Sequence, residues 1–278
     1  MKNSKPPSPA LKNLLDSVAA GDLSVEQALV RMSQTETVAL ENATVDIGRA
    51  VRCRFGEVIY GEGKSAELIA SIAKTQLTHG QSVLITRLND ANAKAIETKF
   101  ERCIYHSEAR TMRISIADEG VEKSPVESLP VGGRPIVAVV TAGSTDSHVA
   151  AEAVQTLLWM NVAVDEIHDV GVAGPQRLLS VVPRLRQASV IVVIAGMEAA
   201  LASAVGGHVA CPVIAVPTSV GYGTTFGGIT ALLGMLCSCS SNVSVVGIDA
   251  GFKGGYVAGL IATQLEDVIR SALLDRSS

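Results

Sequence analysis

The sequence predicts an α/β protein whose larger, C-terminal domain is a doubly wound parallel sheet. From residue 135 onward, short apolar runs rich in Val and Ile alternate with helix-length segments, the pattern of a parallel sheet covered by helices on both faces. Glycine-rich turns follow several of these runs. Apolar residues make up 47% of the 278 residues but aromatic residues only 3%, so we expect a core of closely packed Val, Ile, Leu and Ala.

Five strand–helix units are expected in this C-terminal domain. The strands are expected at residues 135–140, 163–167, 190–195, 213–216 and 243–248, and the helices at 147–160, 175–187, 197–205, 225–237 and 255–274. Ligands of such sheets bind beyond the carboxyl ends of the strands. The turns that follow the strands are therefore the predicted site.

A helical segment is predicted at the N-terminal end, over residues 1–36. Its first residues are rich in Pro and Ser and are expected to be disordered, and two helices are expected at 8–18 and 24–33. The second helix begins with Ser24 and Gln27 in the spacing of a capping box. Packing against the body of the protein or against a partner is the simplest role for this helical hairpin.

A small α/β domain is predicted at residues 37–118, joined by a linker at 119–134 to the catalytic domain at 135–278. Its strands are expected near residues 57–60, 82–85, 105–107 and 111–116, and its helices at 65–78 and 91–99.

A charged cluster lies at the start of the small domain. Asp46, Arg49 and Arg52 are spaced three residues apart, as on one face of a helix. A solvated face explains this spacing most simply, but Asp46 and Arg49 are kept as candidate site residues.

Composition and charge exclude several classes of function. The net charge is −4 and the pI about 5.8, which does not fit a nucleic-acid-binding protein. No apolar run reaches the roughly 18 residues that a membrane span needs, and the start of the chain lacks the pattern of a signal peptide. The five cysteines are odd in number and scattered, so we expect free thiols and a cytoplasmic location. Cys237 and Cys239 have no second pair at zinc-site spacing, so no metal site is expected.

The turn at residues 141–147 is a candidate phosphate-binding loop. Free backbone N–H groups at the start of the following helix suit an anion, Gly143 allows close approach, and Ser144 adds a hydroxyl donor. Asp146 would repel a phosphate but could hold a ribose hydroxyl. An ordinary helix N-cap is the alternative.

A second and more specific candidate loop spans residues 217–228. Its density of Gly, Ser and Thr costs conformational entropy that a plain connection does not require. We interpret it as a second loop that holds an anion or a nucleotide. The candidate residues in it are Thr218, Ser219, Gly221, Tyr222 and Gly223.

Single residues with chemical potential follow other strands. Gly196, Met197 and Glu198 come after the strand at 190–195, and this position favours a site role for Glu198 over a simple interaction with a helix dipole. Asp249 is expected at the same sheet edge, where it could orient a substrate.

The residue types alone do not decide the roles of Cys239 and Lys64. Composition cannot choose between Cys239 and Cys237 as a nucleophile, and most single cysteines are small buried apolar residues. Lys64 follows a glycine turn, but the spacing of a P-loop is absent, which excludes an NTPase.

The C-terminal domain resembles the PurE-type aminoimidazole ribonucleotide carboxylases and mutases at residues 143–146, 195–196 and 212–217. A closer resemblance, over about residues 38–265, is to the LarB family, the pyridinium-3,5-biscarboxylic acid mononucleotide synthases of nickel-pincer cofactor biosynthesis. The segments that carry it are 61–64, 141–143, 169–174, 195–198, 205–207, 212–223, 226–228 and 238–239.

The resemblance to LarB implies carboxylation of nicotinic acid adenine dinucleotide. In that family a cysteine thiolate adds to the pyridinium ring, C5 of the ring attacks CO2, and loss of a proton and of the cysteine restores aromaticity. The phosphoanhydride is also hydrolysed, which releases AMP. By motif position the cysteine is Cys239, and Glu198 and Lys64 match positions suited to handling CO2 and the C5 proton.

The same resemblance sets expectations about cofactors and partners. No tightly bound cofactor is expected; CO2 or bicarbonate is a co-substrate, and Mg2+ is a possible aid. A homo-oligomer is expected. The product is expected to serve a nickel enzyme, such as an enzyme of lactate racemization.

The chain departs from these families at a few positions. PurE enzymes carry a catalytic Ala-His-Arg segment where this chain has Gly171 to Gly174, with Val172 in place of the His, so Gly171 is kept as a substrate-binding candidate only. Cys237 and Ala250 stand where LarB proteins usually have Asn. Two alternatives stay open: a PurE-like carboxylase of a purine precursor, and a nucleotide-binding protein without catalysis.

Overall fold

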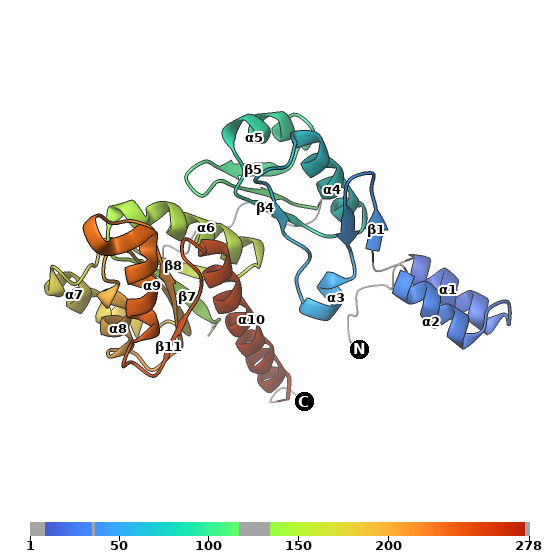
Figure 1. The fold of residues 1–278 in the computed structure, drawn as a ribbon. Coiled ribbons are helices and arrows are strands. Elements are labelled where there is room, and N and C mark those ends of the chain that lie inside the picture. Colours follow the sequence, from blue (N-terminus) through green and yellow to red (C-terminus); the bar gives the residue numbers. More distant parts are fainter. Residues whose placement is uncertain (1–8, 35–36, 117–133, 276–278) are drawn as a thin grey trace.

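The computed structural model describes residues 9–34, 37–116 and 134–275, which form a helical hairpin, a small α/β domain and a larger α/β domain (Figure 1). The hairpin consists of α1 (Pro9–Ala19) and α2 (Val25–Gln34), as predicted. The Ser24 N–H donates to Gln27 Oε1 at 3.0 Å and the Gln27 N–H donates to Ser24 Oγ at 3.2 Å, which confirms the capping box. The predicted disorder at the start of the chain and almost all of the predicted linker lie outside the described residues.

The small domain contains a four-stranded mixed sheet in the order β3-β4-β6-β5. Its elements are β3 (Ile59–Tyr60), α4 (Ala66–Thr78), β4 (Val83–Thr86), α5 (Asp90–Glu97), β5 (Cys103–His106) and β6 (Thr111–Ile114). β3 is parallel to β4, whereas β6 runs antiparallel to both β4 and β5. Ile69, Ile85 and Met112 are fully buried between the sheet and the helices.

A hairpin that the sequence did not predict opens the small domain. It pairs β1 (Thr37–Ala39) with β2 (Thr44–Asp46) in antiparallel register and leads into the five-residue helix α3 (Arg49–Cys53). The expected helix face of Asp46, Arg49 and Arg52 is therefore wrong. Asp46 pairs with Thr37 across the hairpin, and Arg52 reaches back from α3 to bind the Asp46 carboxylate at 2.6 Å.

The larger domain is a doubly wound sheet of five parallel strands, in the order β11-β10-β9-β7-β8. The strands are β7 (Ile136–Thr141), β8 (Ala163–Ile167), β9 (Val190–Ala195), β10 (Val213–Pro217) and β11 (Val243–Val245). The helices are η1 (Ser144–Asp146), α6 (Ser147–Trp159), α7 (Pro175–Leu185), α8 (Ala200–Gly206), η2 (Gly223–Gly228), α9 (Ile229–Leu236) and α10 (Gly251–Asp275). α6 and α10 cover one face of the sheet, and α7, α8 and α9 cover the other.

The strand order places a topological switch point between β7 and β9. From β7 the chain moves outward to β8, then returns past β7 and continues through β9, β10 and β11. The turns after β7 and β9 therefore leave the sheet on opposite faces, and in doubly wound sheets ligands bind beyond the carboxyl ends of the strands at such a point. The turns that the sequence analysis selected as candidates lie at this edge.

Several element boundaries differ from the predictions. The strand expected at 243–248 ends at Val245, and the helix expected at 197–205 begins at Ala200, because Met197 and Ala199 have φ angles of 53° and 57°. The helix expected at 225–237 is interrupted, since Phe226, Gly227 and Gly228 also have positive φ angles. Such left-handed backbone cannot continue an α-helix.

The two α/β domains pack together through α6 and α10. The indole N–H of Trp159 donates to the Ser82 carbonyl at 3.1 Å, and the Phe55 ring lies 5.7 Å from the Trp159 ring and 5.9 Å from the Tyr256 ring. Within residues 9–34, 37–116 and 134–275, no helix is both long enough and apolar enough to cross a membrane.

Candidate functional site

Asp146 joins the two predicted anion-binding loops. One carboxylate oxygen accepts the Gly143 N–H at 3.0 Å, and the other accepts the Thr218 hydroxyl at 2.7 Å. Asp146 is only 3% exposed, and burial raises the pKa of its carboxyl group while these two hydrogen bonds lower it. Both oxygens have internal partners, so in this structure Asp146 and the fully buried Thr218 hold the loops together.

The turn after β9 fits closely against the glycine-rich loop. The Met197 N–H donates to the Val220 carbonyl at 3.0 Å, and the Thr218 N–H donates to the Ala195 carbonyl at 3.0 Å. A Cβ on Gly196 would lie 2.3 Å from the Val220 carbonyl oxygen, which is part of the backbone and cannot rotate away. Only glycine permits this approach of the two loops.

The Gly196→Ala substitution is therefore expected to displace residues 218–220 and to lower the stability of the fold by about 1–3 kcal/mol. Gly207→Ala is the matched control, because its nearest neighbour would be the Ala204 carbonyl oxygen at 3.6 Å, an ordinary contact. Urea unfolding of both variants measures the difference. Equal stability of the two would show that the loop yields without cost.

The glycine-rich loop is held at its start and exposed beyond it. The Ser219 N–H donates to Asp249 Oδ1 at 2.8 Å, and the Asp249 N–H donates to the Pro217 carbonyl at 2.9 Å. The next residues, Gly221 and Gly223, are exposed, and Tyr222 between them is 80% exposed. Asp249 thus positions the backbone of this loop, and the open part of the loop is available to a ligand.

The loop after β8 packs on the loop after β7. The Gly171 N–H donates to the Ala142 carbonyl at 2.9 Å, and a Cβ on Gly171 would lie 2.7 Å from the same oxygen. The Asp169 N–H donates to the Thr141 hydroxyl at 3.1 Å. Gly171 is buried in this contact, whereas Ser144 stays exposed on η1.

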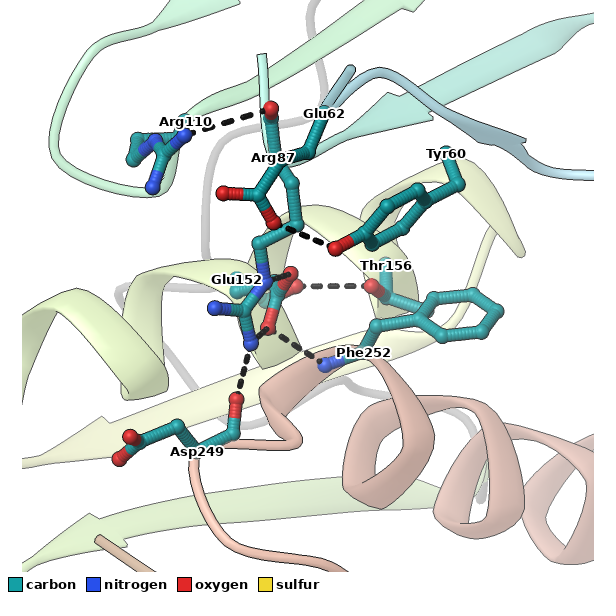
Figure 2. A network of polar contacts seen from close by, with 8 residues as sticks. All are labelled: Tyr60, Glu62, Arg87, Arg110, Glu152, Thr156, Asp249 and Phe252. Carbon is teal, nitrogen blue, oxygen red and sulfur yellow. Dashed lines mark hydrogen bonds and ion pairs between the residues drawn. The ribbon is translucent and has the colours of Figure 1, made fainter. Parts of the chain in front are cut away.

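An arginine of the small domain binds the same edge of the larger domain, which sequence reasoning missed (Figure 2). Arg87 Nε donates to Glu152 Oε1 at 3.1 Å, and Arg87 Nη2 donates to the Asp249 carbonyl. The other oxygen of Glu152 accepts the Phe252 N–H at 3.1 Å. Arg87 therefore connects the small domain to both α6 and the turn that carries Asp249.

The position of Glu152 in the sequence contained a signal that it needs a charged partner. It is a single acid within the apolar stretch at 149–158 and is only 4% exposed. Burial raises the pKa of the Glu152 carboxyl, and the charge of Arg87 is the largest opposing influence. A carboxylate on the buried face of a helix requires a cationic partner, although the sequence does not say which one.

The loop that carries Lys64 belongs to the same region of the small domain. The Gly61 N–H donates to the carbonyl of Thr86, the residue before Arg87, at 2.8 Å, and Lys64 Nζ donates to the Tyr60 carbonyl at 2.7 Å. Tyr60 donates a hydrogen bond to Glu62, which raises the pKa of the phenol, while the nearby charges of Arg87 and Arg110 lower it. Figure 2 shows Tyr60, Glu62 and Arg110 around Arg87.

Glu198 lies in the turn between β9 and α8. Its side chain is exposed, and its carbonyl oxygen packs against Gly234 of α9, where a Cβ would approach to 2.7 Å. Glu198 is therefore at the predicted carboxyl edge of the sheet, but it precedes the helix rather than belonging to its first turn.

Cys239 is exposed and free in the loop between α9 and β11. The flanking Ser238 and Ser240 fix this loop to α8 by hydrogen bonds of 2.7 and 2.8 Å to Ser203. The Val213 N–H donates to the Asn242 carbonyl at 2.9 Å, which places the loop at the edge where β10 and β11 begin. In Figure 1 this segment and the small domain lie on different sides of the larger domain.

Among the described residues, the candidates thus fall into three groups. The first group is one connected edge, which consists of the turns at Gly143 and Gly196 together with Asp146, Thr218, Ser219 and Asp249. Arg87 connects this edge to the small domain. Cys239 lies at the other end of the strands. Asp46 and Arg49 lie in β2 and α3, away from both.

Comparisons with known proteins agree with this two-domain arrangement. A family described as the LarB/PurE-like N-terminal domain matches residues 37–116, and the AIR carboxylase family matches residues 136–277. An uncharacterized protein of Methanocaldococcus jannaschii, MJ0165, is 35% identical over 266 residues, covering 91% of this chain and 96% of its own length.

The larger domain is also similar to solved structures. Treponema denticola PurE is 17% identical, covering 52% of this chain and 98% of its own, with a TM-score of 0.37. An archaeal flavodoxin is 15% identical, covering 47% and 99%, with a TM-score of 0.31. The two matched families and the 35% identical relative account for nearly all of the described chain. The protein belongs to the LarB family and carries a PurE-like, AIR carboxylase domain, which makes it a carboxylase-type enzyme.

Proposed function

We propose that this enzyme carboxylates the pyridinium ring of nicotinic acid adenine dinucleotide at C5 and hydrolyses its phosphoanhydride. The products are pyridinium-3,5-biscarboxylic acid mononucleotide and AMP. The observation that carries the proposal is the union of a LarB-type N-terminal domain with an AIR carboxylase domain that presents a free, exposed thiol at Cys239.

The proposed chemistry balances without a redox cofactor. The Cys239 thiolate adds to the electron-poor ring, which becomes an enamine whose C5 forms a bond to CO2. A base removes the proton from C5, and the electron pair expels the thiolate and restores aromaticity. Water cleaves the phosphoanhydride, so that one phosphate stays on each product.

The other candidate residues fit supporting roles. The exposed Glu198 carboxylate is suited to accept the C5 proton, and the ammonium of Lys64 is suited to stabilise the new carboxylate. The exposed part of the glycine-rich loop, around Gly221 and Gly223, is suited to offer backbone N–H groups to the phosphates. Mg2+ would neutralise part of the pyrophosphate charge, so activity should be compared with and without it.

The proposal requires a second copy of the chain. Lys64 belongs to the small domain, which contacts the carboxyl edge through Arg87, whereas Cys239 lies where β10 and β11 begin. One chain cannot present both to one pyridinium ring in the arrangement observed. A homo-oligomer in which one copy offers Cys239 to the loops of another would complete the site.

Mass spectrometry after incubation with nicotinic acid adenine dinucleotide and 13C-bicarbonate tests the function. We expect AMP together with a doubly carboxylated mononucleotide that carries one 13C atom. AMP together with an uncarboxylated mononucleotide would show that the protein hydrolyses the phosphoanhydride but does not carboxylate the ring. Carboxylation of aminoimidazole ribonucleotide instead would favour the PurE reaction, and no turnover of either would favour a binding protein.

A further inference from the structure

Two loops of the proposed site belong to different domains. Lys64 lies in the turn between β3 and α4 of the small domain, and Ser219 lies in the glycine-rich loop after β10 of the larger domain. These loops are far apart in the sequence, so contacts across the domain boundary must fix where one lies relative to the other. Thr86, the last residue of β4, and Arg87, which follows it, provide such a contact.

The backbone at Arg87 is fixed to the loop that carries Lys64. The Gly61 N–H donates to the Thr86 carbonyl at 2.8 Å, and a Cβ on Gly61 would lie only 3.0 Å from the same oxygen. Arg110 Nη2 donates to the Arg87 carbonyl at 3.4 Å (Figure 2). The base of the Arg87 side chain is therefore held next to the Lys64 loop.

The side chain of Arg87 crosses to the larger domain and ends on the backbone of Asp249 (Figure 2). Its Nη2 donates to the Asp249 carbonyl, while its Nε donates to Glu152 Oε1 at 3.1 Å. A planar guanidinium that binds two acceptors in this way has a fixed orientation. The pair with Glu152 therefore aims the remaining donor of Arg87 at the Asp249 turn.

Asp249 passes this contact on to the glycine-rich loop. Its carbonyl accepts from Arg87, its N–H donates to the Pro217 carbonyl at 2.9 Å, and its Oδ1 accepts the Ser219 N–H at 2.8 Å. Asp249 has a φ angle of 53°, in the left-handed region. Such a conformation costs free energy in a residue other than glycine and persists where surrounding contacts hold it. Arg87 is one of these contacts, so it helps to keep the carboxylate on Ser219.

We propose that Arg87 is a positioning residue for the glycine-rich loop and acts through Asp249. By this route the small domain sets the position of the loop to which the phosphates of the substrate bind, and it keeps Lys64 next to that loop. Arg87 acts on the loop and does not contact the substrate. The proposal rests on the proposed function only for the identity of the ligand.

Hydrogen–deuterium exchange of the full-length protein without substrate tests the route from Arg87 to the loop. Arg87→Met and Asp249→Gly should each speed exchange in peptides that cover residues 217–223 by about tenfold. Glycine adopts left-handed backbone without strain, so Asp249→Gly removes the carboxylate alone. The double variant should exchange no faster than Asp249→Gly, because Arg87 acts through Asp249. Additive effects, or unchanged exchange in Arg87→Met, would overturn the proposal.

Trp159→Phe is the matched control for a weakened contact between the domains. It removes another hydrogen bond between them, in which the indole N–H donates to the Ser82 carbonyl at 3.1 Å. Exchange at residues 217–223 should stay as in the wild type. If Trp159→Phe speeds it as much as Arg87→Met does, the effect is a general loosening of the two domains, and Arg87 has no positioning role.

Kinetics separate positioning from a loss of folded protein. The KM for nicotinic acid adenine dinucleotide, measured by release of AMP, should rise about tenfold in Arg87→Met because the phosphate loop is no longer held. Partial unfolding would instead lower kcat per total protein and leave KM unchanged, and that result would mark Arg87 as structural. If the wild type does not turn over this dinucleotide while the exchange results are as expected, the proposed reaction fails and the coupling of Arg87 to the loop stands.

Discussion

Replacing Cys239 with Ala is expected to lower the rate of carboxylation of nicotinic acid adenine dinucleotide by about a thousandfold or more. Without the thiolate the ring stays electron-poor and cannot attack CO2, and loss of a covalent nucleophile generally has effects of this size or larger. Release of AMP should continue, because cleavage of the phosphoanhydride does not need the thiol. Incorporation of 13C-bicarbonate and formation of AMP are measured in the same reaction.

Cys237→Ala is the matched control for this prediction. Cys237 is also exposed and free, and it lies two residues away at the end of α9. It should keep full carboxylation. If Cys237→Ala loses activity and Cys239→Ala keeps it, the nucleophile has been assigned to the wrong thiol.

A mixing experiment then tests whether two copies share the site. Lys64→Ala and Cys239→Ala should each be inactive in carboxylation, but a mixed assembly made by co-expression should regain part of the activity. In such an assembly some sites combine an intact Lys64 from one copy with an intact Cys239 from another. No recovery in a verified mixed assembly would contradict the shared site.

The Arg87→Met variant is expected to lose about 3 kcal/mol of unfolding free energy near neutral pH. The side chain of Glu152 is only 5% exposed, and removal of its cationic partner leaves a buried charge unpaired. The contact between the small domain and the Asp249 turn is lost with it. Urea unfolding measures the loss.

This loss should depend on pH with a defined sign. In the unfolded chain the pKa of glutamate is about 4.3. Burial raises the pKa of Glu152 in the folded protein. Above about pH 4.3 the folded state therefore holds more protons than the unfolded state, and stability falls as pH rises. Arg87 lowers the folded pKa, so Arg87→Met raises it further and extends the fall to higher pH. The deficit of the variant should be larger near pH 7.5 than near pH 5.

The double variant Arg87→Met with Glu152→Gln is the control for the pH effect. The amide oxygen of the introduced glutamine can still accept the Phe252 N–H, but the side chain no longer ionises. The extra dependence on pH should therefore disappear. An equal deficit of Arg87→Met at both pH values would show that Glu152 does not respond to the charge of Arg87.

The sequence by itself determined the features that depend on neighbours in the chain. The apolar runs became the strands of the parallel sheet, and Ser24 and Gln27 became a capping box, because alternation, burial and capping act over a few residues. The glycine-rich turns after the strands were likewise predicted, because their density of Gly, Ser and Thr is a local pattern. Residue motifs also identified the family.

Only the tertiary structure decided which residues meet. Asp46 became a strand residue because Thr37 pairs with it, and left-handed backbone at Phe226 and Gly227 interrupted an expected helix. Arg87 and Glu152 are 65 residues apart in sequence, and no local pattern says that they bind each other. Such contacts depend on how the two α/β domains pack, and their free energies arise from burial and charge at the contact rather than from any segment alone.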